Sequence, residues 1–75
     1  NGISLSGGIT TPDRNEARVK STVVLNSQIV YILADHSKFD QISAVTFAQL
    51  GRVKIITDKL QDKKYLTKAN IKEVM

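Results

Sequence analysis

Six consecutive apolar or aromatic residues at positions 29–34 are followed without a break by the polar residues 35–38. A short apolar run rich in β-branched side chains is typical of a strand buried on both faces in a helix-covered parallel sheet. The run therefore predicts an α/β fold in which Asp35 follows the end of a central strand. Ligands of open α/β sheets bind outside the carboxyl ends of the strands, so a small polar site is expected there.

The segment before this strand predicts a helix from Pro12 or Asp13 to Ser27. Thr10 or Thr11 is the expected N-cap, and proline suits the first turn because its missing N–H would be unpaired there anyway. Ala17, Ser21, Val24 and Gln28 share one face of this helix, with Val19 and Val23 beside it, so a moderately apolar stripe can pack on the sheet. A helix that returns so promptly into a strand is half of a βαβ unit, with a right-handed crossover expected.

The remaining segments predict a second strand over residues 53–57 and a helix over residues 63–74, the latter with a thin apolar face. Residues 1–5 read as the tail of a strand and residues 6–8 as a turn. Residues 42–50 are expected to be a loop with one helical turn. No repeat, low-complexity tract or second domain is present in the sequence.

The length of 75 residues allows one small domain, whose core is near the lower limit for independent stability. Because the chain starts inside a motif and without Met, we expect a fragment that needs a partner chain or the rest of its domain. The absence of Cys excludes disulfides and thiolate metal sites and fits a cytoplasmic origin. No apolar run approaches the roughly 20 residues of a membrane span, so no membrane partner is expected.

The net charge of +4 arises entirely after residue 51, where seven cations face three acids. A basic patch of this kind could contact the phosphates of a nucleic acid. The interleaving of cations with acids, and the excess of Lys over Arg, favour a solvated surface instead.

Asp35, Ser37 and Lys38 are the candidate binding residues of the polar segment. The Asp35 carboxylate could accept hydrogen bonds from sugar hydroxyls or cap a turn through its own backbone, and Ser37 could likewise bind or cap. Lys38 could supply a positive charge for a phosphate. His36 has no second His or Cys to complete a metal site, and a Ser-His-Asp triad is rejected because adjacent side chains diverge. We predict no metal, cofactor or catalytic residue.

Residues 34–39, Ala-Asp-His-Ser-Lys-Phe, resemble the Ala-Asp-x-Ser-Lys-Phe signature of the sensor domain of DeoR-type bacterial transcription regulators. Four other segments match the same family in the same order: residues 1–4, residues 8–12, residues 16–20 with Glu16 and Lys20, and residues 55–58, Ile-Ile-Thr-Asp. The resemblance covers roughly the first 58 residues.

The resemblance implies a Rossmann-like, partly parallel sheet with flanking helices, the fold of sugar-phosphate isomerases and coenzyme A transferases. It implies that residues 1–75 are the C-terminal part of a sensor domain for a phosphorylated sugar or related metabolite, in an oligomeric regulator. DNA would be bound only by a separate helix-turn-helix domain that nothing in this chain resembles. Asp35, Lys38, Lys20, Glu16, Ser37 and Gly2 are the implied ligand-binding residues, although Glu16 and Lys20 could equally form a plain surface ion pair.

Two other functions stay open. An isomerase-like enzyme is suggested by fold analogy alone, and fold does not carry function. An oligomerisation scaffold without a ligand is suggested by the small core.

Overall fold

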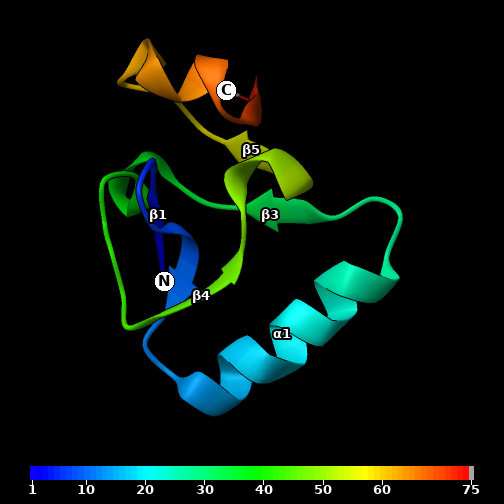
Figure 1. Ribbon diagram of the computed structural model, residues 1–75. Helices are drawn as coiled ribbons and strands as arrows, with labels where there is room; N and C mark the ends of the chain where they lie inside the picture. Colours follow the sequence, from blue (N-terminus) through cyan, green and yellow to red (C-terminus); the bar gives the residue numbers. More distant parts are fainter. Residues whose placement is uncertain (75) are drawn as a thin grey trace.

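The computed structural model describes residues 1–74, which fold into two three-stranded β-sheets and one α-helix (Figure 1). The first sheet is antiparallel, with the order β1 (Gly2–Ser4), β2 (Gly8–Thr11) and β4 (Val45–Ala48). The second sheet is parallel, with the order β3 (Tyr31–Leu33), β5 (Lys54–Thr57) and β6 (Asn70–Glu73). The α/β class predicted from the sequence is therefore confirmed, as are the strands near residues 1–5, 29–34 and 53–57.

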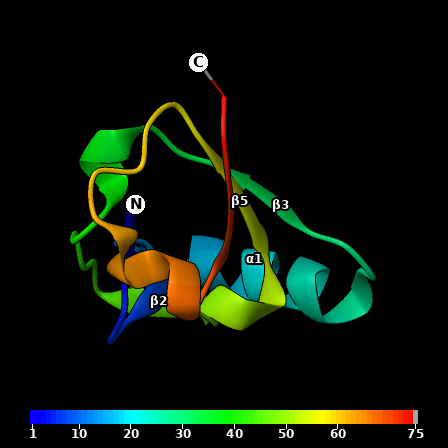
Figure 2. The ribbon, with the colours of Figure 1, turned by 90° about the horizontal axis from the view of Figure 1, so that it is seen from above.

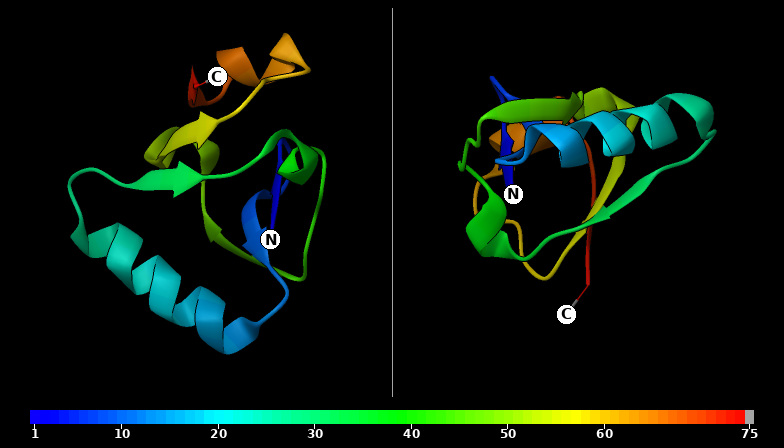
Figure 3. Two further views of the ribbon diagram at one scale, coloured as in Figure 1. Left: turned by 180° about the vertical axis from the view of Figure 1, so that it is seen from behind. Right: turned by 90° about the horizontal axis from the view of Figure 1, so that it is seen from below.

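Helix α1 (Arg14–Asn26) connects the two sheets and packs against β2 and β4 of the antiparallel one (Figure 3). Its buried residues are Ala17 and Val24, two members of the predicted stripe. The strands that flank it in sequence, β2 and β3, belong to different sheets. Within residues 1–74, α1 is consequently no crossover between two parallel strands, which differs from the predicted half of a βαβ unit.

The core joins both sheets and the helix. Its buried apolar residues are Ile3, Ile9, Ala17, Val24, Phe47, Ala48, Leu50, Val53, Ile55 and Tyr65. Ile32, Ile55 and Ile71 lie in register across the parallel sheet, so their side chains point to the same face, toward this core. Seen from above, β3 and β5 run side by side across the molecule (Figure 2).

Strand β3 is less buried than its apolar sequence predicts. Tyr31 is 58% exposed and Leu33 is 79% exposed, so the prediction of a strand covered on both faces is wrong for this chain. β3 also lies at the edge of its sheet and pairs only with β5 among the described residues. Backbone groups of Val30 and Ala34 bond β5, so those of Tyr31 and Leu33 point the opposite way.

The start of the helix differs from the prediction. Asp13 is the N-cap, and its carboxylate accepts hydrogen bonds from the backbone N–H groups of Asn15 and Glu16 at 2.8 and 3.2 Å. Thr10 and Thr11 are instead fully buried in β2. The residue before a proline is disfavoured in the helical conformation, which keeps the chain extended up to Pro12 and moves the cap to the next residue.

Two further predictions are wrong. The segment expected to be a loop with a helical turn, residues 42–50, contains strand β4. The helix expected over residues 63–74 is replaced by a 3₁₀ turn, Lys63–Thr67, followed by strand β6. Pairing with β2 in the first case, and with β5 in the second, supplies the backbone hydrogen bonds that a local pattern cannot reveal.

Candidate functional site

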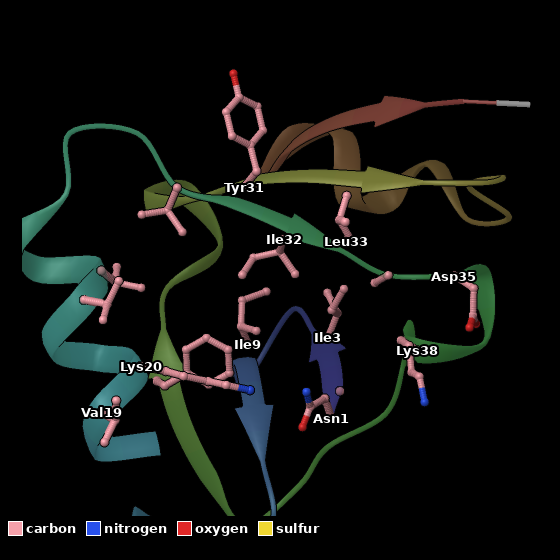
Figure 4. A pocket seen from close by; sticks show the side chains of 16 residues that line it. Asn1, Ile3, Ile9, Val19, Lys20, Tyr31, Ile32, Leu33, Asp35 and Lys38 are labelled. Atoms are coloured by element: carbon pink, nitrogen blue, oxygen red, sulfur yellow. The ribbon is translucent and has the colours of Figure 1, made fainter. Parts of the chain in front are cut away.

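A cavity of about 430 Å³ lies between α1, β3 and the hairpin formed by β1 and β2 (Figure 4). Its apolar wall includes Ile3, Ile9, Val24, Ile32 and Phe47, which come from all of these elements and from β4. The cavity has the size and the mainly apolar wall of a small-molecule site. It also follows β3 along its whole length, because each of residues 30–34 lines it.

Four of the six candidate binding residues line this cavity: Gly2, Lys20, Asp35 and Lys38. They come from three segments that are distant in sequence, namely β1, α1 and the loop after β3. In Figure 4 the Lys20 side chain extends from α1 beside Ile9, whereas Asp35 and Lys38 lie at the opposite end. The cavity thus has the Lys20 ammonium on one side of an apolar wall and the opposite charges of Asp35 and Lys38 on the other.

Glu16 does not line the cavity, but it holds a residue that does. Its carboxylate lies 2.7 Å from the Lys20 ammonium, one helical turn away. The same ammonium lies 5.2 Å from the centre of the Phe47 ring, within range of a cation–π contact. These two contacts direct the Lys20 side chain along the cavity wall.

Ser37 likewise acts on a lining residue and lies outside the lining itself. Its backbone N–H donates to the Asp35 carboxylate at 2.8 Å, and its hydroxyl donates to the same oxygen. Both hydrogen bonds lower the pKa of Asp35, the one from the hydroxyl more than the one from the backbone N–H, and the nearby Lys38 ammonium lowers it further. Asp35 therefore caps the 3₁₀ turn His36–Lys38 and also lines the cavity.

Gly2 lines the cavity and also meets a packing requirement. A Cβ atom at this position would lie 2.2 Å from the main-chain oxygen of Gln41, far inside van der Waals contact. The glycine thus allows two backbone segments to approach each other at the edge of the cavity.

His36 and Asp58 form a pair that sequence reasoning missed. The Asp58 carboxylate accepts from the His36 backbone N–H at 2.8 Å and lies 2.8 Å from His36 Nδ1. This ring contact is the main cause that holds the pKa of Asp58 well below its ordinary value. The signal was present in the sequence, because polar residues that follow neighbouring parallel strands meet at one edge of the sheet.

Sequence reasoning also missed parts of the wall. Val19 and Val23 are mostly exposed on α1 and line the cavity, as does Asn1.

Residues 1–74 hold no group of three His, Asp or Glu side chains placed to bind a metal ion. None of the helices in this part of the chain is long and apolar enough to span a membrane. The cavity is suited to bind a small molecule with an anionic group, hydroxyls and some apolar surface.

Comparison with curated proteins finds relatives among transcriptional regulators. The chain is 41% identical over 62 residues to the uncharacterized HTH-type transcriptional regulator FruR of Bacillus subtilis, covering 83% of the chain and 25% of that protein. It is 34% identical over 70 residues to the regulator IolR of the same organism, covering 92% of the chain and 28% of IolR. The HTH-type regulator GlpR of Haloferax volcanii is 38% identical over 63 residues, covering 83% of the chain and 25% of GlpR.

The chain spans about a quarter of the length of these relatives. No solved structure matches it. Residues 1–59 match the family model described as the DeoR C-terminal sensor domain. The chain therefore belongs to the DeoR family, as a member of its C-terminal sensor domain family.

Proposed function

We propose that this chain is the C-terminal part of an effector-sensing domain that binds a phosphorylated sugar or related metabolite in a regulator of carbohydrate metabolism. The observation that carries the proposal is the cavity that brings Gly2, Lys20, Asp35 and Lys38 together from three segments. Family membership supports a sensing role in transcription regulation. We assign DNA binding to a separate helix-turn-helix domain. We further propose that the complete sensor domain has a Rossmann-like fold and that the regulator is an oligomeric, cytoplasmic protein.

The chemistry of the cavity supports this class of ligand. Either Lys20 or Lys38 can contact a phosphate, and the Asp35 carboxylate can accept hydrogen bonds from hydroxyls. Asp35 is ionised at neutral pH even at the ordinary pKa of an aspartate, and its pKa is lowered further, so its carboxylate is an acceptor there. Lys20 is already paired with Glu16, whereas Lys38 belongs to the same turn as Asp35. We therefore assign the main phosphate contact to Lys38.

The test is an amide-resolved NMR titration of the chain with fructose phosphates, glucose 6-phosphate and glycerol 3-phosphate, with inorganic phosphate as the control. We expect one sugar phosphate to shift the amides of residues 35–38 and 16–20, and inorganic phosphate to leave most of them unchanged. Lys38→Gln should abolish the shifts, whereas Lys68→Gln, outside the cavity, should keep them. If none of these sugar phosphates shifts the amide signals of residues 35–38 and 16–20, the result would count against the proposal.

The same samples separate sensing from catalysis. A sensor leaves the sugar phosphate chemically unchanged over hours, whereas an isomerase converts it, and both are visible in the ligand's own NMR signals. Turnover that is lost in Asp35→Asn would replace sensing by the enzymatic alternative.

A further inference from the structure

The loop that carries Asp35 and Lys38 is attached to the neighbouring strand by a side chain outside the cavity. Strands β3 and β5 run parallel, with Leu33 opposite Ile56, so the residues that follow them leave the sheet together. The Ala34 N–H still bonds the Ile56 carbonyl at 3.0 Å. Asp58 is thereby brought to the base of the loop formed by residues 35–38.

Asp58 binds His36 at two points with two different oxygens. Oδ1 accepts from the His36 backbone N–H, and Oδ2 lies at hydrogen-bond distance from Nδ1 of the ring, both at 2.8 Å. Because a carboxylate only accepts, the ring nitrogen that faces it must carry the proton. Two bonds from one residue fix its orientation as well as its position.

His36 lies between the two cavity-lining members of the loop, as Ser37 does. Asp35 precedes it, and the Lys38 N–H bonds the Asp35 carbonyl at 3.1 Å across the turn. His36 itself does not line the cavity, and its side chain is 46% exposed. Fixing this residue therefore fixes the turn as a unit without placing Asp58 against a ligand.

We propose that Asp58 is a positioning residue, which holds the loop 35–38 against the end of β5 and so sets where Asp35 and Lys38 stand at the cavity. The part the loop plays in binding rests on the function proposed above, whereas its attachment to Asp58 does not. The competing explanation is that Asp58 only caps its own turn, since it also accepts from the Lys59 N–H at 2.8 Å.

The experiment compares amide exchange with water in the wild-type chain and in Asp58→Asn, Asp58→Ala and His36→Ala, measured by NMR. Asp62→Asn is the matched control, because Asp62 also accepts a backbone hydrogen bond, from Lys64, and forms no hydrogen bond or ion pair with residues 35–38. The Ala34 amide, bonded within the sheet, reports whether the fold is intact. The long-range nitrogen–proton couplings of the His36 ring report which nitrogen carries the proton.

We expect exchange at the His36 amide to rise about tenfold in Asp58→Ala and by less in Asp58→Asn, which keeps one acceptor oxygen, with Ala34 unchanged. The His36 ring should lose its preference for a proton on Nδ1 in both variants, and His36→Ala should shift the amides of Ser37 and Lys38. The same shifts in Asp62→Asn would overturn the proposal, because they would reflect general loosening. Exchange that changes at Lys59 alone would also overturn it, in favour of a local cap.

The outcome is separable from that of the proposed function. If no sugar phosphate binds the wild-type chain, the sensing proposal fails while the exchange data still decide the role of Asp58. If one binds, a positioning role predicts an affinity about tenfold lower in Asp58→Ala and unchanged in Asp62→Asn. Equal affinity in Asp58→Ala would overturn positioning and leave sensing intact.

Discussion

Removing the hydroxyl of Tyr65 tests how the two sheets are joined. Tyr65 is fully buried, and its ring packs edge-on against Phe39 with the ring centres 4.9 Å apart. The hydroxyl oxygen lies 2.6 Å from the Asp40 carboxylate, 3.0 Å from the Asp40 backbone nitrogen and 3.3 Å from the Ile3 carbonyl oxygen. Tyr65→Phe keeps the ring contact and deletes these polar ones.

The expected cost follows from the number of hydrogen bonds. A hydroxyl has one proton, which it donates to the Asp40 carboxylate because that oxygen is nearer than the Ile3 carbonyl. It also accepts one hydrogen bond from the Asp40 N–H, so two hydrogen bonds are lost in Tyr65→Phe. At a net value of about 1 kcal/mol each, the free energy of unfolding falls by about 2 kcal/mol. No extra amount is added for the charge of Asp40, because that side chain is exposed and regains water.

The assay is thermal unfolding followed by circular dichroism. For a domain of this size, a loss of about 2 kcal/mol corresponds to a decrease in Tm of about 8–16 °C. Tyr31→Phe is the matched control: it removes the same hydroxyl from a ring that is 58% exposed, and it should leave Tm nearly unchanged. If both variants shift Tm equally, the hydroxyl of Tyr65 does not join the sheets and the reasoning is wrong.

Three other perturbations test separate parts of the structure. Gly2→Ala should lower the free energy of unfolding by about 1–3 kcal/mol, because its Cβ would meet the Gln41 carbonyl, whereas Gly51→Ala has open space and should be tolerated; urea unfolding measures both. Asp13→Ala removes the N-cap of α1 and should cost about 1 kcal/mol, with reduced helical circular dichroism; an unchanged urea midpoint would contradict this cap. The folded pKa of Asp58 lies below its ordinary 3.8, so the stability that this carboxylate contributes is present above pH 3.8 and is lost as the pH falls below it. In urea unfolding measured at several pH values, Asp58→Asn should therefore lose less stability on acidification than the wild type. Parallel curves of stability against pH would refute the assignment.

The sequence predicted those elements whose signal is local. The apolar runs around Ile32 and Ile55 identified the parallel pair β3 and β5, and the stripe with Ala17 and Val24 identified α1. It failed where a strand depends on a distant partner. Ile71 became part of β6 because it lies opposite Ile55 in the sheet, which a thin helical stripe over the same residues could not show.

The candidate site was predictable in part, for a related reason. Asp35 and Lys38 follow a strand end, which is a position that physical reasoning alone singles out. Glu16 and Lys20 came from the family resemblance, and the cavity wall then linked Lys20 to the same space. The contact between His36 and Asp58 could not be predicted from the sequence, because it depends on the register of β3 against β5 in the sheet.

The exposed edge of β3 affects how this chain behaves at high concentration. Its outward backbone groups, flanked by the apolar side chains of Tyr31 and Leu33, offer a template to which any extended chain can add as a further strand. β3 contains neither Lys nor Pro, the residues that discourage such pairing at a sheet edge. Samples prepared for spectroscopy therefore need dilution series, since strand addition would slow tumbling and broaden signals along the cavity whether or not a ligand is present.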